Sequence, residues 1–342
     1  SKSFMFSSET HQIEDSLKNI SSNINSNGNL SIITKGNDNN INILGSILNA
    51  KEDLNLESNG NIDILNVKDT DYSYYYNMKQ KADIHMVCYN FMPIFDWTRT
   101  DFYHPLPDGS TALFYEKSKI LDDPKKMVEY METHSGDYTM PGWEPERMAR
   151  INELFQQYEG FGKEQLWDSL KYFLEALMPT CHECGIKMAI HPDDPPWDIF
   201  GLPRLLINEE AIERFLKMVD DPYNCLTLCS GSLGANGQNN VAEIVAKHCD
   251  RIAFAHIRNV KIYENGDFSE VSHRDCDGDV GILNIVKAYY DNGFEGYVRP
   301  DHGRHIWGEQ CRPGYGLYDR ALGCMYLQGC FDMLERVNQK QK

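Results

Sequence analysis

The sequence predicts an α/β protein in which a (β/α) barrel follows a short segment of β-repeats, and three observations support this prediction. Apolar runs of strand length alternate with amphipathic helices between residues 83 and 342. Short polar–apolar runs with Asn and Gly corners recur in residues 20–68. The composition changes sharply at the tyrosine-rich stretch 70–82. We therefore expect two parts, residues 1–80 and residues 81–342.

The barrel is predicted from strands and helices that alternate along the chain. The runs that read as strands are Ile84–Tyr89, Ile186–Ile190, Cys225–Leu228, Arg251–Ala255 and Glu295–Arg299, with a briefer run at Phe268–Ser272. Helical apolar spacing is found in Lys163–Cys184, Glu209–Val219, Val241–Cys249, Ile282–Asp291 and Leu317–Arg336. Strands joined by right-handed helical crossovers form a parallel sheet. So many successive units favour a barrel, with function at the carboxyl ends of its strands.

Three local features qualify this alternation. Residues 91–115 are expected to form a long loop, which is either a lid or an excursion packed on its own aromatic residues. Residues 120–160 are charged and helical in tendency, with a break at Met140-Pro141-Gly142. Pro179 is expected to bend or interrupt the first long helix.

The charge and the cysteines limit the classes of function. The 342 residues include 33 Lys and Arg and 51 Asp and Glu, which gives a net charge of −18. Such acidity argues against nucleic acid or an anionic membrane as partner, because both attract basic patches. No apolar run approaches the ~20 residues of a membrane span, and no signal peptide is visible. The ten scattered cysteines fit reduced thiols. We expect a cytoplasmic enzyme with a small-molecule substrate, and a homo-oligomer is allowed.

The first part of the chain contains four alternating runs of brief-strand length. They are Asn29-Leu30-Ser31-Ile32, Asn40-Ile41-Asn42-Ile43, Asp53-Leu54-Asn55-Leu56 and Asn61-Ile62-Asp63-Ile64. Regular returns through Asn/Gly corners favour a short β-solenoid with these apolar residues inward, whereas a plain β-meander or a partly disordered polar segment is the alternative. Residues 20–68 resemble the repeats of filamentous-haemagglutinin-type secreted adhesins. No catalytic constellation is evident in them.

Four strand exits in the second part carry side chains of the metal-ligand type. They are His191, Cys229, His256 and Asp301. Parallel strands deliver their exits to one end of a barrel, so these side chains are expected to converge. Alone, each Cys or His is more often a core or structural residue, and the coincidence of four is what favours a site. Two imidazoles, a thiolate and a carboxylate can hold a divalent transition metal such as Fe(II), Zn or Mn(II).

With these residues in place, residues 84–342 resemble the mannonate dehydratase family. The matching segments are Val87-Cys88-Tyr89-Asn90-Phe91-Met92-Pro93, Asp96-Trp97-Thr98-Arg99-Thr100, His191-Pro192-Asp193-Asp194-Pro195-Pro196, Gly201-Leu202-Pro203-Arg204, Cys229-Ser230-Gly231-Ser232, His256-Ile257-Arg258, Gly278-Asp279-Val280, Arg299-Pro300-Asp301-His302-Gly303 and Pro313-Gly314-Tyr315. The resemblance implies a TIM-type barrel related to xylose isomerase. It also implies Mn(II) or Fe(II) held by His191, Cys229, His256 and Asp301. The implied reaction converts D-mannonate to 2-dehydro-3-deoxy-D-gluconate and water in hexuronate breakdown.

Further site residues follow from the chemistry of such a dehydration. A base must take the C2 proton and an acid must protonate the leaving hydroxyl, and His302 and Tyr315 are the candidates, with their two roles unassigned. Arg99, Arg258 and Arg299 could hold the substrate carboxylate by bidentate pairing. Ordinary loop salt bridges are the equally plausible reading for these arginines.

The N-terminal part of the chain differs from the pattern of the family. The family begins with about two further strand–helix units, and here the haemagglutinin-like segment stands in their place, as in a fusion of two pieces. An incomplete barrel is therefore expected, with a gap that impairs activity. Two other functions compete: a metal-dependent sugar isomerase or epimerase on the same barrel, and a non-enzymatic adhesin fusion fragment.

Overall fold

The computed structural model describes six short strands within residues 24–65, and residues 84–339 apart from 96, 121–123, 136–137, 139, 141–142 and 145–147. The chain divides into two compact units, Ser1–Ile84 and His85–Lys342. None of the described helices is long and apolar enough to cross a membrane.

The six strands of the first unit form three parallel pairs. They are β1 (Ile24–Ser26), β2 (Leu30–Ile33), β3 (Ile41–Leu44), β4 (Leu48–Ala50), β5 (Leu54–Glu57) and β6 (Ile62–Leu65). Each of the first three strands pairs with the third strand after it: β1 with β4, β2 with β5 and β3 with β6. The predicted alternating runs thus fall on strands β2, β3, β5 and β6. The predicted inward direction of their apolar side chains lies outside the described residues.

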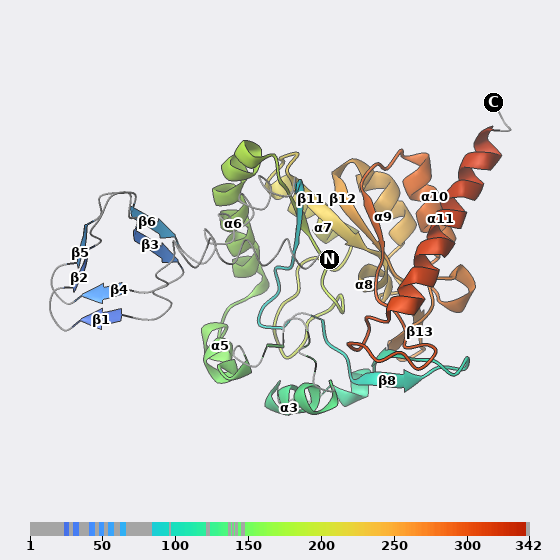
Figure 1. Cartoon of the computed structure of the whole chain (residues 1–342), viewed down its shortest axis with the longest axis horizontal. Coiled ribbons are helices and arrows are strands. Elements are labelled where there is room, and N and C mark those ends of the chain that lie inside the picture. The colour runs from blue at the N-terminus through green and yellow to red at the C-terminus, as the bar shows by residue number, and fades with distance from the viewer. Residues whose placement is uncertain are drawn as a thin grey trace, which may run out of the picture. The chain divides into compact units, whose positions relative to one another are not determined.

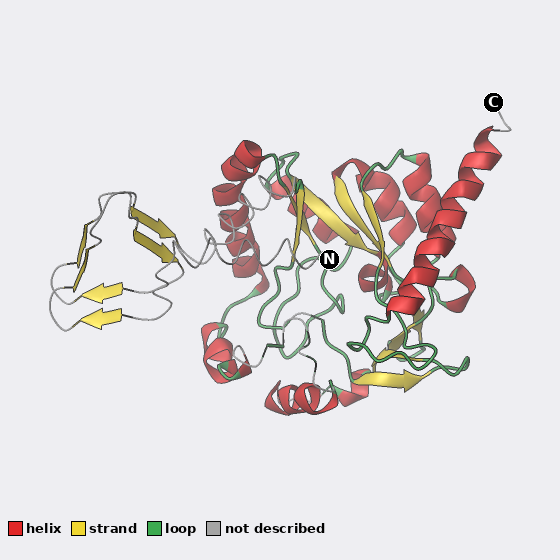
Figure 2. Cartoon of the chain, viewed as in Figure 1, coloured by secondary structure: helices red, strands yellow, loops and turns green. Residues whose placement is uncertain are grey.

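A five-stranded parallel sheet forms the centre of the second unit (Figure 2). Its strands are β7 (Met86–Tyr89), β10 (Lys187–Ile190), β11 (Asn224–Cys229), β12 (Ile252–Ile257) and β15 (Tyr297–Pro300). They lie side by side in chain order, and every neighbouring pair is parallel. All five match strands predicted from the sequence to within two residues. This curled sheet is a partial barrel, since a closed (β/α) barrel has eight strands.

Helices connect the parallel strands and flank the sheet (Figure 1). They are α6 (Lys163–Cys184), α7 (Glu209–Met218), α8 (Ser230–Gly234), α9 (Val241–His248), α10 (Ile282–Asp291) and α11 (Leu317–Gln339). Helix α6 continues through Pro179, which therefore does not interrupt it: the proline removes one backbone hydrogen bond, and the turns on either side remain helical. Two further helices, α3 (Pro124–His134) and α5 (Ile151–Gln157), flank the predicted break near Met140.

A second, antiparallel sheet corrects the prediction of a long loop over residues 91–115. It contains β8 (Asp101–Pro105), β9 (Thr111–Tyr115), β13 (Val260–Ile262) and β14 (Phe268–Glu270), in the order β13-β14-β9-β8. The turn between β8 and β9 has Gly109 at φ +81°, a conformation that glycine adopts without strain. The briefer predicted strand is β14, and it joins this sheet rather than the barrel.

Burial differs between the inner and the outer parallel strands. All six residues of β11 are buried, as are five of six in β12. In contrast, Tyr297 and Val298 of the outer strand β15 are 60% and 39% exposed. Inner parallel strands are covered on both faces and paired on both sides, so their apolar runs are removed from water.

Candidate metal centre

Four donor side chains meet at the carboxyl ends of four neighbouring parallel strands. His191 follows β10, Cys229 ends β11, His256 is the last residue but one of β12, and Asp301 follows β15. One ligand atom from each lies within 4.8 Å of all the others. The sheet register contributes directly, because Cys229 and His256 are paired across β11 and β12. The predicted convergence of these four residues is therefore present, while their role as metal ligands stays a prediction.

The distances within this cluster suit a single ion. Cys229 Sγ and His256 Nδ1 lie 3.7 and 3.6 Å from Asp301 Oδ2. Two atoms bound to one ion at roughly 2.0–2.3 Å lie at most about 4.6 Å apart, so only small shifts would bring all four donors onto one ion. His191 Nδ1 lies 2.7 Å from the carbonyl oxygen of Pro192 and can donate a hydrogen bond to it. The lone pair of His191 Nε2 then faces no proton of its own and is the one suited to bind a metal ion.

Unpaired and perturbed groups in the cluster also fit a cation. Both ring nitrogens of His256 are buried without a hydrogen-bond partner, which is costly unless something binds them. Burial opposes ionisation of Cys229, yet His191, His256 and Arg258 hold the pKa of its thiol well below the usual range. Burial likewise opposes ionisation of Asp301, but His256 and other neighbouring cations hold its pKa well below the usual range. A thiolate and a carboxylate are the ionised forms that metal ligation requires.

A buried network of four charges lies beside the cluster, and it was only partly foreseen. Arg99 and Arg258 both pair with Asp194 and with Glu270, at distances of 2.7 to 3.0 Å. All four residues are at most 2% exposed. Burial opposes ionisation, but Arg258, His302 and Arg99 lower the pKa of Glu270 to about 2. Gly231 makes room for Arg258, since a Cβ there would lie 2.6 Å from the arginine stem.

The predicted arginines thus differ in their surroundings. Both Arg99 and Arg258 have their guanidinium groups paired with protein carboxylates within this network. Arg299 Nη2 lies 3.0 Å from Asp301 Oδ1, and its side chain remains 35% exposed. Of the three, Arg299 therefore has the most freedom to meet a substrate. Binding of a substrate carboxylate by any of them stays a prediction.

His302 and Tyr315 lie together next to the donor cluster. His302 is 7% exposed, and its Nδ1 lies 3.1 Å from Glu270 Oε1 while Nε2 lies 3.8 Å from Asp301 Oδ2. The rings of His302 and Tyr315 are 5.6 Å apart. The backbone is closely packed beside them, since a Cβ on Gly316 would lie 1.9 Å from the carbonyl oxygen of Arg304.

Glu270 and Asp194 are the two residues of this site that the sequence did not single out. Asp194 stands in the His-Pro-Asp-Asp-Pro-Pro segment, so its place after a strand exit was a usable signal. Glu270 comes from β14 in the antiparallel sheet, 171 residues from Arg99 along the chain. No local pattern marks such a partner.

The fold and the donor set define a class of protein: an α/β enzyme with four metal-type donor side chains gathered at the carboxyl ends of a curled parallel sheet. A family model described as D-mannonate dehydratase (UxuA) matches residues 37–341. The chain belongs to the mannonate dehydratase family. This confirms the resemblance found in the sequence for the second part of the chain.

Individual relatives agree with this assignment. The chain is 60% identical over 261 residues to "Mannonate dehydratase 1" of Bacillus licheniformis, which covers 76% of this chain and 71% of the relative. It is 54% identical over 259 residues to the mannonate dehydratase of Bacillus subtilis, covering 75% and 72%. The crystal structure of mannonate dehydratase from Streptococcus suis serotype 2 superposes with a TM-score of 0.67 at 40% identity, over 80% of this chain and 71% of that one.

The predicted resemblance of residues 20–68 to haemagglutinin repeats is not supported by these comparisons. The family model begins at residue 37 and so extends into that segment. The strands of residues 24–65 do pair in parallel, but unrelated families share such pairing, so it does not support the haemagglutinin resemblance.

Proposed function

We propose that this protein is a metal-dependent dehydratase that converts D-mannonate to 2-dehydro-3-deoxy-D-gluconate and water in hexuronate breakdown. The observation that carries the proposal is the convergence of four metal-type donors beside a buried His–Glu pair, in a chain of the mannonate dehydratase family. Dehydration of a sugar acid removes the proton at C2 and expels the hydroxyl at C3, and the resulting enol becomes the 2-keto group. Atoms balance with one water released.

The residues of the site suit the two proton transfers. Glu270 accepts from Nδ1 of His302, which fixes the tautomer and leaves Nε2 free to take or give a proton. The hydroxyl of Tyr315 is the second candidate for proton transfer. Arg299 is suited to orient the substrate carboxylate by charge-assisted hydrogen bonds. A divalent ion held by His191, Cys229, His256 and Asp301 would supply stabilisation of the negative charge that develops on substrate oxygens.

We propose Mn(II) or Fe(II) as that ion. A mixed set of two imidazoles, one thiolate and one carboxylate supports a first-row divalent metal rather than Mg²⁺ or Ca²⁺, which prefer oxygen ligands. Elemental analysis of protein purified without chelator, followed by titration with each metal, tests this. Equal binding of Mg²⁺ would contradict it.

The decisive test of the function is product analysis. Purified protein with Mn(II) or Fe(II) and D-mannonate should yield a 2-keto-3-deoxy acid, detected by mass spectrometry as loss of one water. A product of unchanged mass would instead support the rival isomerase or epimerase. No conversion with any metal would favour the non-enzymatic fusion fragment.

We propose that activity of the chain by itself is impaired. Within the described residues the parallel sheet has five strands, fewer than the eight of a closed barrel, and an incomplete barrel would admit water to a site that benefits from its exclusion. Turnover of roughly 1–10³ s⁻¹, the ordinary enzymatic range, would show that the open sheet is sufficient.

We propose a cytoplasmic location, which the free thiols of the chain support. The ten cysteines are all free thiols, and a thiolate ligand needs a reducing compartment to stay one. Thiol titration of the protein denatured directly from cells should give ten reactive groups. A homo-oligomer remains a proposal, which sedimentation of the purified protein tests.

We also propose that the chain has the predicted two parts, 1–80 and 81–342, with the first a short β-solenoid. Parallel pairing of each strand with the third one after it supports successive coils, with partners such as Ile24 and Leu48 lying 24 residues apart. Urea denaturation should give two transitions. A single transition that includes both parts would argue against independent units.

A further inference from the structure

A second group of metal-type donors lies on helices α7 and α9, outside the candidate metal centre (Figure 1). Among the described residues, two groups of three or more His, Cys, Asp or Glu side chains bring ligand atoms within 4.8 Å of one another. One is the group at the carboxyl ends of the strands. The other consists of Glu209 and Glu213 on α7 and His248 on α9, and we call it the α7–α9 cluster. The two groups share no residue and no helix or strand.

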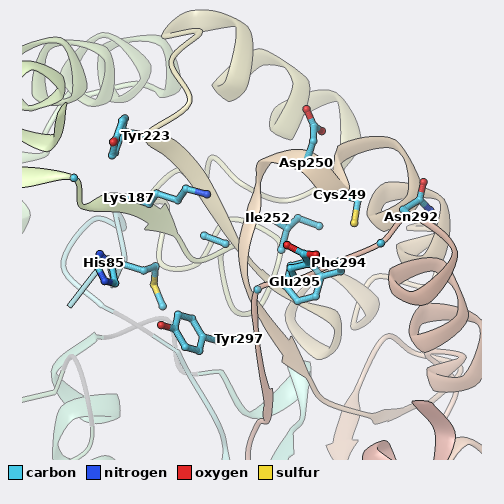
Figure 3. A pocket seen from close by; sticks show the side chains of 15 residues that line it. His85, Lys187, Tyr223, Cys249, Asp250, Ile252, Asn292, Phe294, Glu295 and Tyr297 are labelled. Carbon is cyan, nitrogen blue, oxygen red and sulfur yellow. The ribbon is translucent and has the colours of Figure 1, made fainter. Parts of the chain in front are cut away.

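The open pocket at the amino ends of the parallel strands contains no comparable group. This pocket has a volume of about 650 Å³, and Cys249, Asp250 and Glu295 are among the residues that line it (Figure 3). Of the residues that the structure describes, no three ligand-type side chains converge there. A further cation site is therefore better supported between α7 and α9, where three such side chains meet.

The two glutamates of the α7–α9 cluster already hold a positive charge in common. Glu209 and Glu213 are four residues apart, so they are neighbours on one side of α7, and like charges at this spacing repel each other. Lys247 lies between them: its Nζ is 2.5 Å from Glu209 Oε1 and also donates to Glu213 Oε1. The second carboxylate oxygen of Glu213 accepts from Lys217 at 2.9 Å. The cluster thus has a defined place for a cation.

The lysine does not account for the third donor, His248. This residue is 8% exposed, and its Nε2 is buried without a hydrogen-bond partner, although a nitrogen of the ring lies within 4.8 Å of both carboxylates. Such unpartnered groups are rare in folded proteins, because their burial is costly. Burial and the charge of Lys247 lower the pKa of His248, so the ring is neutral at pH 7 and has a lone pair to donate.

We propose that Glu209, Glu213 and His248 form a second site, for a divalent ion such as zinc, which displaces Lys247 and links α7 to α9. Carboxylate oxygens and imidazole nitrogens are ligands that zinc accepts, and water can complete its coordination. Two atoms bound to one ion at roughly 2.0–2.2 Å lie at most about 4.4 Å apart, so small side-chain shifts would bring the three donors onto it. This site does not depend on the proposed dehydratase function.

Equilibrium dialysis of the full chain against zinc, with elemental analysis of the bound metal, provides the direct test. Glu213→Gln removes one ligand charge while keeping the shape of the side chain. It should weaken binding at this site by about 100-fold or more, since even the outer partners of metal ligands contribute ~10–100-fold. The variant should therefore bind one equivalent fewer than the unaltered chain, whether or not the candidate metal centre is also filled.

Glu210→Gln is the matched control for this measurement. Glu210 is on the same helix and is exposed, and its substitution changes the net charge equally, but it lies outside the cluster. Its zinc binding should equal that of the unaltered chain. Equal binding by Glu210→Gln and Glu213→Gln would overturn the proposed site.

A change at Lys247 distinguishes a metal site from an ordinary ion pair. Because zinc must displace the ammonium group, Lys247→Met should tighten zinc binding by about three- to tenfold, the range expected for losing one or two exposed ion pairs. Unchanged or weaker binding by this variant would contradict the displacement of Lys247.

Thermal denaturation tests whether the ion links the two helices. Zinc that binds only the native state raises the melting temperature. We expect a larger rise for the unaltered chain and for Glu210→Gln than for Glu213→Gln. His248→Gln should also show the smaller rise, and where that variant fails to fold, the comparison of the two glutamate variants still decides. Equal rises in all the folded variants would overturn the proposal.

Discussion

Charged groups are arranged differently at the two ends of the parallel sheet. At the carboxyl ends, Asp194, Glu270 and Arg258 are at most 2% exposed, and each lies within 3.0 Å of an opposite charge. At the amino ends, Lys187 and Glu295 are exposed around an open pocket. Burying an ion costs several kcal/mol of folding free energy unless the ion is well paired. The buried charges at the carboxyl ends are therefore retained at a cost in stability, as is typical of a functional site. The solvated charges at the other end carry no such cost.

The largest effect should come from the proton-transfer candidate at the carboxyl ends. Tyr315→Phe should lower turnover by ~10²–10⁴-fold if its hydroxyl is the acid or base. Steady-state assay of the keto-deoxy product measures this. Tyr318→Phe is the control, since Tyr318 is 48% exposed on α11. An unchanged rate for the folded Tyr315→Phe variant would remove Tyr315 from the mechanism.

Breaking the buried network should strongly reduce stability. Arg258→Met leaves two buried carboxylates short of a partner and should lower the free energy of unfolding by about 3–5 kcal/mol. Arg214→Met removes an ion pair with Glu164 whose side chains are 43% and 72% exposed, and it should cost at most about 1 kcal/mol. Urea denaturation of both variants compares them. Similar losses of unfolding free energy would mean that the buried network stabilises the protein no more than one surface ion pair does.

Acid should weaken the carboxyl-end network through Glu270. Its pKa is about 2 in the folded protein, below the value of about 4.3 for an unfolded chain. A depressed pKa contributes stability that is present above the unfolded value and is lost as pH falls through the folded value. We therefore expect unfolding free energy to decline between about pH 4.3 and 2, by on the order of 3 kcal/mol from this group. Glu270→Gln should flatten the decline in that window, and an identical pH profile would refute the assignment.

The smallest effect should be found in β15, the last strand of the described parallel sheet. Val298→Ala removes two methyl groups from a side chain that is 39% exposed, and it should change stability by no more than about 0.5 kcal/mol. In β11, Leu228→Ala truncates a side chain that is 2% exposed and should cost about 2–5 kcal/mol. Thermal denaturation of the chain measures both. A large loss at Val298 would contradict the low packing energy that its exposure predicts.

The sequence predicted the parallel strands and the four donors because both depend on local signals. Each donor, such as His191 or Asp301, stands directly at or next to the end of an apolar run, and parallel order brings such ends together. The hairpin of β8 and β9 was misread as a loop, since the run Asp101–Pro105 shows no clear alternation of polar and apolar residues. Glu270 could not be found, because two of its partners, Arg99 and His302, lie 171 and 32 residues away along the chain.

Arg299 has a kinetic consequence beyond its contact with Asp301. The protein carries a net charge of −18, so a sugar-acid anion approaches against an overall repulsive field. A guanidinium that is 35% exposed beside the donor cluster offers one local attraction on that approach. Added salt should then have two opposing effects on the bimolecular rate of substrate capture: it screens the repulsion at long range and the attraction at short range. With Arg299→Gln only the first effect remains, and capture should become faster with salt at every concentration below about 0.2 M.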